Sequence, residues 1–317
     1  MKRTSFGRGT VMAAIILAAS GCVGPSAGDS DDRLAVVATT TQVGSVAAEI
    51  GADAIQLDML LEPGVEAHDF ELTPEHAAAL ERADIVLISG AGLEEWLNDA
   101  LATSGGEGRV RDLSEGVTLR TPGEGEPAHA EDDDDHVDEV DPHYWLSAAN
   151  AVIMAENVRD ALTEAAPDDA DGFAQRADEL IGRIETADAE IAALMDDIPN
   201  ERRKVVTDHD ALGYFIDAYG LEFVGSVFPS LDVSSEPSAQ EIEALVEEIR
   251  SEGVQAIFTE SSVNPRLAEA VANETDARLI DEPIYTDSLG APDSGAETLD
   301  GMLLHNARVI HDGLTGV

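Results

Sequence analysis

Three histidines and one aspartate stand in four separate loops, each next to a strand or helix that the sequence predicts. His68 follows an apolar strand over residues 55–60 that Pro63-Gly64 end, and it precedes a helix that begins at Thr73-Pro74. The other three loops are Asp141–Ser147 with His143, Thr207–Asp210 with His209, and Tyr285–Gly290 with Asp287. A lone loop histidine is usually an ordinary surface residue, but three imidazoles and a carboxylate at such junctions can form a four-ligand site for a divalent transition metal.

The same loops carry motifs through which the chain resembles the substrate-binding proteins of ABC importers for zinc and manganese, the cluster A-I solute-binding family. These motifs include Pro63-Gly64 with His68, Gly92-Leu93-Glu94-Glu95-Trp96-Leu97, Asp141-Pro142-His143-Tyr144-Trp145, His209-Asp210-Ala211-Leu212-Gly213-Tyr214-Phe215, Ile257-Phe258-Thr259-Glu260 and Tyr285-Thr286-Asp287-Ser288-Leu289-Gly290. The resemblance spans about residues 33–315. It implies that the metal ligands are His68, His143, His209 and Asp287, with Asp281 and Glu282 close enough in sequence to remain alternatives to Asp287.

The predicted donor set favours zinc over manganese as the transported cargo. Three imidazoles suit zinc, manganese accepts more oxygen ligands, and the Irving–Williams order gives zinc the higher intrinsic affinity. The family nevertheless uses similar ligand sets for both Zn2+ and Mn2+. Asp141, Asp208 and Glu260 are candidates for orienting the imidazoles, although acidic residues are common throughout this chain.

A site closed by four protein ligands favours binding and release over catalysis, because a hydrolytic zinc ion keeps a coordination position for water. The sequence contains no His-Glu-x-x-His motif and no phosphate-binding loop ending in Gly-Lys-Ser/Thr. We therefore predict that the chain is not an enzyme and that an ABC permease and ATPase on other chains take up its cargo. The alternative is an adhesin-like or scaffold surface lipoprotein in which the metal is structural.

Residues 1–22 have the pattern of a secretory signal peptide with a lipoprotein junction. Basic residues precede a short apolar run over residues 11–19, which is too short to span a membrane, and Ser20-Gly21-Cys22 follow. Cys22 is the only cysteine, so an internal disulfide is excluded, and its position suits lipidation. Residues 23–32 read as a flexible tether. We expect anchoring at the extracellular face of the cytoplasmic membrane.

The chain is extremely acidic, with 65 Asp and Glu against 18 Lys and Arg and a formal net charge of −47. Nucleic-acid binding needs clustered basic residues and is therefore not expected. The charge is spread along most predicted helices, which favours a surface adapted to molar salt, as in halophilic proteins, over a local metal collector. At about 1 M salt the screening length falls to about 3 Å, which suppresses self-repulsion. Folding should depend on salt.

Alternating strands and helices predict an α/β fold with two lobes, each a parallel sheet flanked by helices. The first lobe is expected over residues 33–170 and the second over residues 200–317. An apolar stripe between them, from Phe173 to Ile198 at spacings of four and three, predicts one long helix over residues 171–199. A coiled-coil arm is the alternative, but the resemblance implies a backbone helix that joins the lobes of a monomer.

Residues 123–140 are predicted to form an acidic disordered loop with two further histidines, His129 and His136. Its place resembles that of the metal-collecting loop of zinc-binding family members, but a solvated linker is the more ordinary interpretation. His76, His305 and His311 are expected to be structural or surface residues, and Trp96 and Trp145 are expected to pack beside the site.

Overall fold

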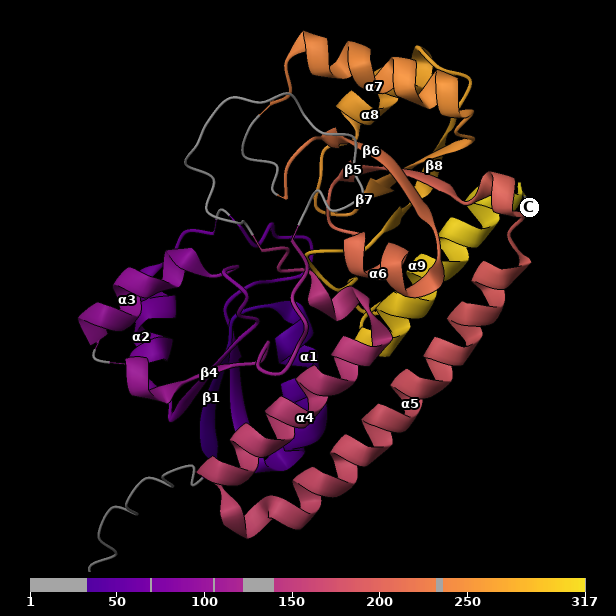
Figure 1. Ribbon diagram of the computed structural model, residues 1–317. Helices are drawn as coiled ribbons and strands as arrows, with labels where there is room; N and C mark the ends of the chain where they lie inside the picture. Colours follow the sequence, from indigo (N-terminus) through magenta and orange to yellow (C-terminus); the bar gives the residue numbers. More distant parts are fainter. Residues whose placement is uncertain (1–32, 69, 105, 122–139, 232–235, 317) are drawn as a thin grey trace, which may run out of the picture. The chain divides into compact units, whose positions relative to one another are not determined.

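The structure, a computed structural model, describes residues 33–68, 70–104, 106–121, 140–231 and 236–316, without the side chains of residues 99, 103, 104 and 107. Figure 1 shows two regions of sheet, with a long helix running beside both. Each sheet has four parallel strands flanked by helices, as the alternation of strands and helices predicts. Within the described residues, no helix is long and apolar enough to cross a membrane.

The first sheet has the strand order β2-β1-β3-β4. Its strands are β1 (Leu34–Ala38), β2 (Ile55–Met59), β3 (Ile85–Ile88) and β4 (Val110–Asp112). The central strands are short apolar runs, typical of parallel sheets that are covered on both faces. The helices of this half are α1 (Thr41–Gly51), α2 (Pro74–Arg82), α3 (Asn98–Ser104) and α4 (Ala148–Ala165).

The second sheet has the order β6-β5-β7-β8, again with the earliest strand inside the sheet. Its strands are β5 (Lys204–His209), β6 (Glu222–Phe228), β7 (Ala256–Glu260) and β8 (Arg278–Ile284). The helices are α6 (Gly213–Tyr219), α7 (Ala239–Glu252), α8 (Arg266–Asn273) and α9 (Leu299–Thr315). Helices α7 and α8 cover one face, and α6 and α9 lie on the other (Figure 1).

The predicted long helix is α5 (Ala170–Asp197), which has 28 residues and packs against α4 and α9. Its buried face follows the predicted stripe as far as Ile191. The next buried position is Met195, whereas Leu194 is only partly buried. The helix ends at Asp197, two residues before Pro199.

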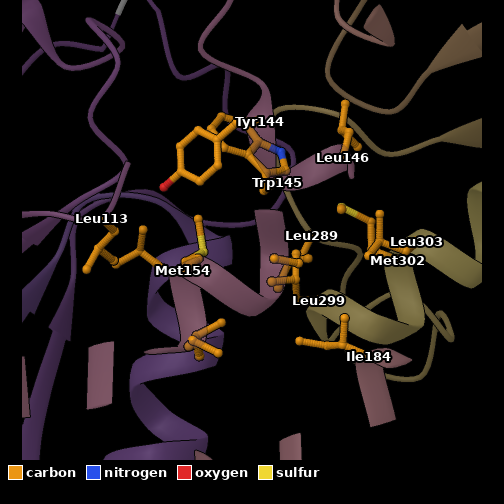
Figure 2. Close-up of a cluster of buried hydrophobic side chains, with 14 of the residues drawn as sticks. Leu113, Tyr144, Trp145, Leu146, Met154, Ile184, Leu289, Leu299, Met302 and Leu303 are labelled. Atoms are coloured by element: carbon orange, nitrogen blue, oxygen red, sulfur yellow. The ribbon is translucent and has the colours of Figure 1, made fainter. Parts of the chain in front are cut away.

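One continuous apolar core joins the two halves (Figure 2). Tyr144 and Trp145, which follow His143, lie in the same cluster as Leu289, which follows Asp287. Met302 and Leu303 of α9 complete this part of the core. Residues 33–317 accordingly group as one compact unit, and the proposed lobe boundaries at residues 170 and 200 stay a prediction.

The sequence also predicts a helix over residues 93–101, and the first half of this prediction is wrong. Gly90, Ala91 and Gly92 all have positive φ, and a 3-10 turn over Glu95–Leu97 precedes α3. The buried Glu94 carboxylate accepts hydrogen bonds from the main-chain N–H groups of Ser89 and Gly90 and from the Thr39 hydroxyl. Glu94 therefore stabilises this left-handed turn, which an amphipathic pattern alone does not reveal. The short strand β4 was not predicted.

Candidate metal centre

The structure brings His68, His143, His209 and Asp287 together, and each offers a ligand atom within 4.8 Å of the others. We call these four residues the ligand cluster. His68 lies in the loop between β2 and α2, and His209 is the last residue of β5. His143 precedes a 3-10 turn that leads into α4, and Asp287 follows β8. Strand ends and helix starts thus meet at one point, as expected for ligand sites in open α/β folds.

The distances within the ligand cluster fit one small cation. Nε2 of His68 lies 3.2 Å from Nε2 of His143, which is 3.1 Å from Oδ1 of Asp287. Nε2 of His209 lies 3.5 Å from Oδ2 of Asp287. A tetrahedral zinc ion with bonds of about 2.0–2.1 Å places its donor atoms about 3.3–3.4 Å apart. The contact between His68 Nε2 and Asp287 Oδ1, at 4.0 Å, is longer, and all the donor atoms lie within 4.8 Å of one another.

Burying the polar atoms of the ligand cluster costs folding free energy unless a cation binds them. The side chains of His143, His209 and Asp287 are 0–2% exposed, and that of His68 is 15% exposed. Among the described residues, the buried Nε2 of His209 and Oδ1 of Asp287 make no hydrogen bond, although Oδ1 lies 3.1 Å from Nε2 of His143. Orphaned buried polar atoms of this kind are rare in folded proteins. A metal ion coordinated by both atoms would satisfy them.

Carboxylates orient the two fully buried imidazoles. Asp141 Oδ1 lies 2.8 Å from Nδ1 of His143, and the Glu260 carboxylate lies 2.9 Å from Nδ1 of His209. With Nδ1 engaged in each ring, Nε2 faces the ligand cluster. Metal-binding histidines usually have a partner of this kind, which fixes the tautomer and the ring orientation.

The third predicted partner, Asp208, contacts neither imidazole ring through a described hydrogen bond. Its Oδ2 accepts the main-chain N–H of Glu260 at 2.8 Å, so it supports the residue that holds His209. Burial and the neighbouring Glu260 charge raise the pKa of Asp208 to about 7.

Charges within the ligand cluster compensate one another. Burial alone lowers the pKa of His143, but its interactions with the Asp141 and Asp287 carboxylates raise the pKa to about 10. Burial also lowers the pKa of His209, and the charges of Glu260 and Asp287 raise it to about 9. Burial raises the pKa of Asp287, yet the imidazoles, led by His209, hold it well below its usual range. A metal ion takes the place of the protons that these imidazoles hold.

Asp287 is the acidic residue that the structure places in the cluster, whereas Asp281 and Glu282 are exposed residues of β8. The main chain before Asp287 is held tightly. Asn306 of α9 pairs with both the N–H and the carbonyl of Tyr285, at 2.9 and 2.6 Å. The Thr286 carbonyl accepts hydrogen bonds from Gln42 Nε2 and Trp145 Nε1, both at 2.9 Å.

Thr286 and Gln42 were not singled out from the sequence. The Thr286 hydroxyl also donates to Glu260, which links the Asp287 loop to the partner of His209. No sequence signal marks such bonds, because their partners are main-chain atoms or residues far along the chain.

The loop that carries His68 is held by hydrogen bonds from Trp96 and to Ser288. Trp96 Nε1 donates to the Ala67 carbonyl at 2.9 Å, and Gly64 N–H donates to the Ser288 hydroxyl at 2.9 Å. The His68 main-chain N–H donates to Glu66 at 2.9 Å. Phe70 packs edge-on against Trp96, with ring centroids 5.0 Å apart.

The remaining histidines of the described chain lie outside the ligand cluster. His76 completes a capping box with Thr73 at the start of α2, which is a structural role. His305 contacts the Pro283 carbonyl, and His311 pairs with Asp197 and Asp312. Cys22, His129 and His136 lie outside the described residues.

Comparison with known proteins gives the family. Residues 36–313 match the model described as ZnuA, zinc-uptake complex component A, periplasmic. The chain belongs to the ZnuA family. This agrees with the resemblance drawn from the motifs, and it places the chain among the substrate-binding components of ABC transporters rather than among enzymes.

Several relatives of this ZnuA family member are named for a metal. It is 29% identical to the manganese-binding lipoprotein MntA of Bacillus subtilis, over 96% of this chain and 98% of that protein. It is 27% identical to the iron-binding protein YfeA of Yersinia pestis, over 82% of this chain and 80% of YfeA.

Solved structures agree with the fold. The periplasmic zinc-binding protein TroA of Treponema pallidum is 27% identical, with a TM-score of 0.78 over 89% of this chain and 99% of TroA. A manganese-bound periplasmic metal-binding protein of Candidatus Liberibacter asiaticus is 26% identical, with a TM-score of 0.77 over 89% of this chain and all of that chain.

Proposed function

We propose that this protein captures a divalent transition metal ion with His68, His143, His209 and Asp287 and delivers it to an ABC importer. The observation that supports this most directly is the convergence of three imidazoles and one carboxylate. Two of the converging atoms, His209 Nε2 and Asp287 Oδ1, are buried and make no hydrogen bond among the described residues. Bound metal is cargo, so the donors need to bind it tightly and release it, with no position kept for reacting water.

Zinc is the proposed cargo on the chemistry of the donors, because three imidazoles and one carboxylate suit zinc. Manganese is the second candidate. Relatives such as MntA are named for manganese, and a manganese-bound structure shares the fold.

The permease and the ATPase are proposed to be separate chains, and the protein is proposed to be a monomer. Cys22 is the proposed lipidation site, which would hold the protein at the extracellular face of the cytoplasmic membrane. Relatives described as substrate-binding lipoproteins support this, including PsaA of Streptococcus mitis. Replacing Cys22 with Ala should release the protein from the membrane fraction, and retention there would contradict lipid anchoring.

The test offers zinc and manganese in equal amounts to the full chain, folded in molar KCl and stripped with chelator. Metal content is then measured by mass spectrometry. One equivalent of zinc, lost in His68→Ala and Asp287→Ala but kept in the control His305→Ala, supports zinc capture at the cluster. Preferential manganese retention keeps the role and changes the cargo.

A structural metal is the contrary outcome. In a capture protein the bound metal exchanges, and cellular metal uptake falls when the ligands are replaced. In a scaffold lipoprotein the metal would be bound, but His68→Ala and Asp287→Ala would leave metal uptake unchanged. Binding that is indifferent to both cluster substitutions would contradict the proposed site.

A further inference from the structure

Arg120 and Asp141 meet where the chain leaves and re-enters the described structure around residues 122–139. They form an isolated antiparallel bridge, in which the Asp141 N–H donates to the Arg120 carbonyl at 2.9 Å. Asp141 is two residues before His143 and is fully buried. The bridge therefore lies directly beside a residue of the ligand cluster.

Every polar group of Asp141 is engaged. Oδ1 accepts the His143 main-chain N–H at 3.0 Å and lies 2.8 Å from its Nδ1, while Oδ2 accepts from Arg120 Nη1 at 3.3 Å. The Asp141 carbonyl accepts from the Tyr214 hydroxyl at 2.9 Å. A buried carboxylate with this set of partners has little freedom to rotate, because each alternative orientation would leave a charge or a donor unpaired.

Arg120 and Asp141 also contact helix α6, which begins four residues after His209. The Tyr214 hydroxyl accepts the Arg120 main-chain N–H at 2.8 Å, and Arg120 Nε donates to Asp217 Oδ2 at 3.1 Å. A Cβ atom at Gly213 would lie only 2.1 Å from Arg120 Nη1, so the guanidinium rests directly against the start of α6. We call Arg120, Asp141, Tyr214 and Asp217 the latch.

We propose that the latch positions His143 and sets how long the metal stays bound. It ties the segment carrying His143 to the helix that follows His209, so these two segments cannot separate while the latch holds. Losing the Tyr214 bond frees the main chain of Asp141, and losing the Arg120 bond frees its Oδ2; in either case Asp141 and the His143 ring that it orients can shift. This inference rests on the proposed function, because it treats His143 and His209 as ligands of one exchanging metal ion.

Tyr214→Phe tests the latch, and Tyr219→Phe is its matched control. Both tyrosines lie on α6, and the Tyr219 hydroxyl donates to Asp188 of α5 at 2.7 Å. Each substitution removes one hydroxyl and the hydrogen bond that it donates, but only the Tyr214 hydroxyl donates to Asp141. The full chain of each variant is loaded with zinc and mixed with excess chromogenic chelator, and zinc release is followed by absorbance.

Zinc should leave Tyr214→Phe about ten-fold faster than the unaltered protein, the rate equivalent of losing the hydrogen bond to the Asp141 carbonyl. Tyr219→Phe should release zinc at the unaltered rate. Equal release rates for Tyr214→Phe and the unaltered protein would overturn the latch. Failure of both the unaltered protein and Tyr219→Phe to bind either zinc or manganese would instead overturn the proposed function.

A spectroscopic measurement separates positioning from general destabilisation. With cobalt in place of zinc, the visible absorption bands report ligand geometry. Tyr214→Phe and Arg120→Met should shift these bands, while Arg120→Lys, which keeps the charge, should restore part of the original spectrum. Spectra that stay unchanged in both latch variants, with only the melting temperature lowered, would show a purely structural role and contradict the proposal.

Discussion

The two sides of the ligand cluster are built differently. On the buried side, His143, His209 and Asp287 are almost fully enclosed, and hydrogen bonds from β7, α9 and the core tryptophan Trp145 fix their surroundings. On the other side, His68 is 15% exposed and lies in a loop without regular structure between β2 and α2. The buried side therefore defines the geometry, and the His68 side is the part of the site that can move with least disruption.

Asp287→Asn should have the largest effect on metal binding. Asp287 is the only carboxylate in the cluster and faces three imidazoles, so the amide removes the charge that balances the cation while keeping the size of the side chain. We expect affinity to fall by well over about 100-fold, the upper end of the loss seen when only a supporting group is removed. Competition against a chelator of known affinity measures this. Asp281→Asn, at an exposed position of β8, is the control.

Replacing the histidines one at a time tests the difference between the two sides directly. His209→Ala removes a ligand that a strand and Glu260 hold in place, and it leaves the Glu260 carboxylate buried without its imidazole. His68→Ala removes a partly exposed ligand whose place water can take. The affinity loss should therefore be clearly larger for His209→Ala. Equal losses in isothermal titration of the two variants would contradict the idea that the buried side dominates.

Glu260→Gln tests how the buried side is held. Glu260 accepts hydrogen bonds from Nδ1 and the main-chain N–H of His209 and from the Thr286 hydroxyl, so it supports two parts of the cluster at once. An amide cannot accept at both of its ends, and we expect an affinity loss of about 10–100-fold. Thr259→Val serves as a control, because the neighbouring Thr259 hydroxyl donates to the Ile280 carbonyl and, within the described part of the chain, does not contact the ligand cluster. An affinity equal to that of the control would show that His209 needs no carboxylate.

How far the sequence predicts this site depends on the range of each interaction. His68, His143 and His209 stand next to predicted strand ends or helix starts, so local patterns and motifs were enough to select them. Asp287 needed the family resemblance, because Asp281 and Glu282 fit the local pattern as well. The sequence does not show that Tyr214 reaches Asp141 or that Asn306 holds Tyr285, since each bond joins a side chain to a main-chain atom, 73 and 21 residues away.

In the fold, too, short-range patterns were predicted and long-range contacts were not. The apolar runs predict the central strands and the stripe predicts α5, because both patterns are local and periodic. The start of α3 was misplaced because Glu94 turns inward to stabilise the left-handed turn at Gly90–Gly92 rather than starting a helix. That inward position depends on Thr39, a residue of another segment, which no window around Glu94 contains.

The smallest expected effect comes from the two tryptophans, which make the same bond on opposite sides of the cluster. Trp96 donates to the carbonyl of Ala67, next to His68, and Trp145 donates to the carbonyl of Thr286, next to Asp287, both at 2.9 Å. In Trp145→Phe, Gln42 still donates to the Thr286 carbonyl, so Asp287 should stay in place. In Trp96→Phe the loop of His68 loses one of its few anchors, a hydrogen bond worth about 0.5–1.5 kcal/mol.

Zinc exchange should therefore be up to about ten-fold faster in Trp96→Phe, which is the rate equivalent of that hydrogen bond. Trp145→Phe should lower the melting temperature of the metal-free protein, since Trp145 is buried in the shared core, but change exchange little. Stopped-flow chelator competition and thermal unfolding, measured on both variants, separate these effects. Faster exchange in Trp145→Phe than in Trp96→Phe would reverse the assignment and show that metal leaves by disturbing the Asp287 loop instead of the His68 loop.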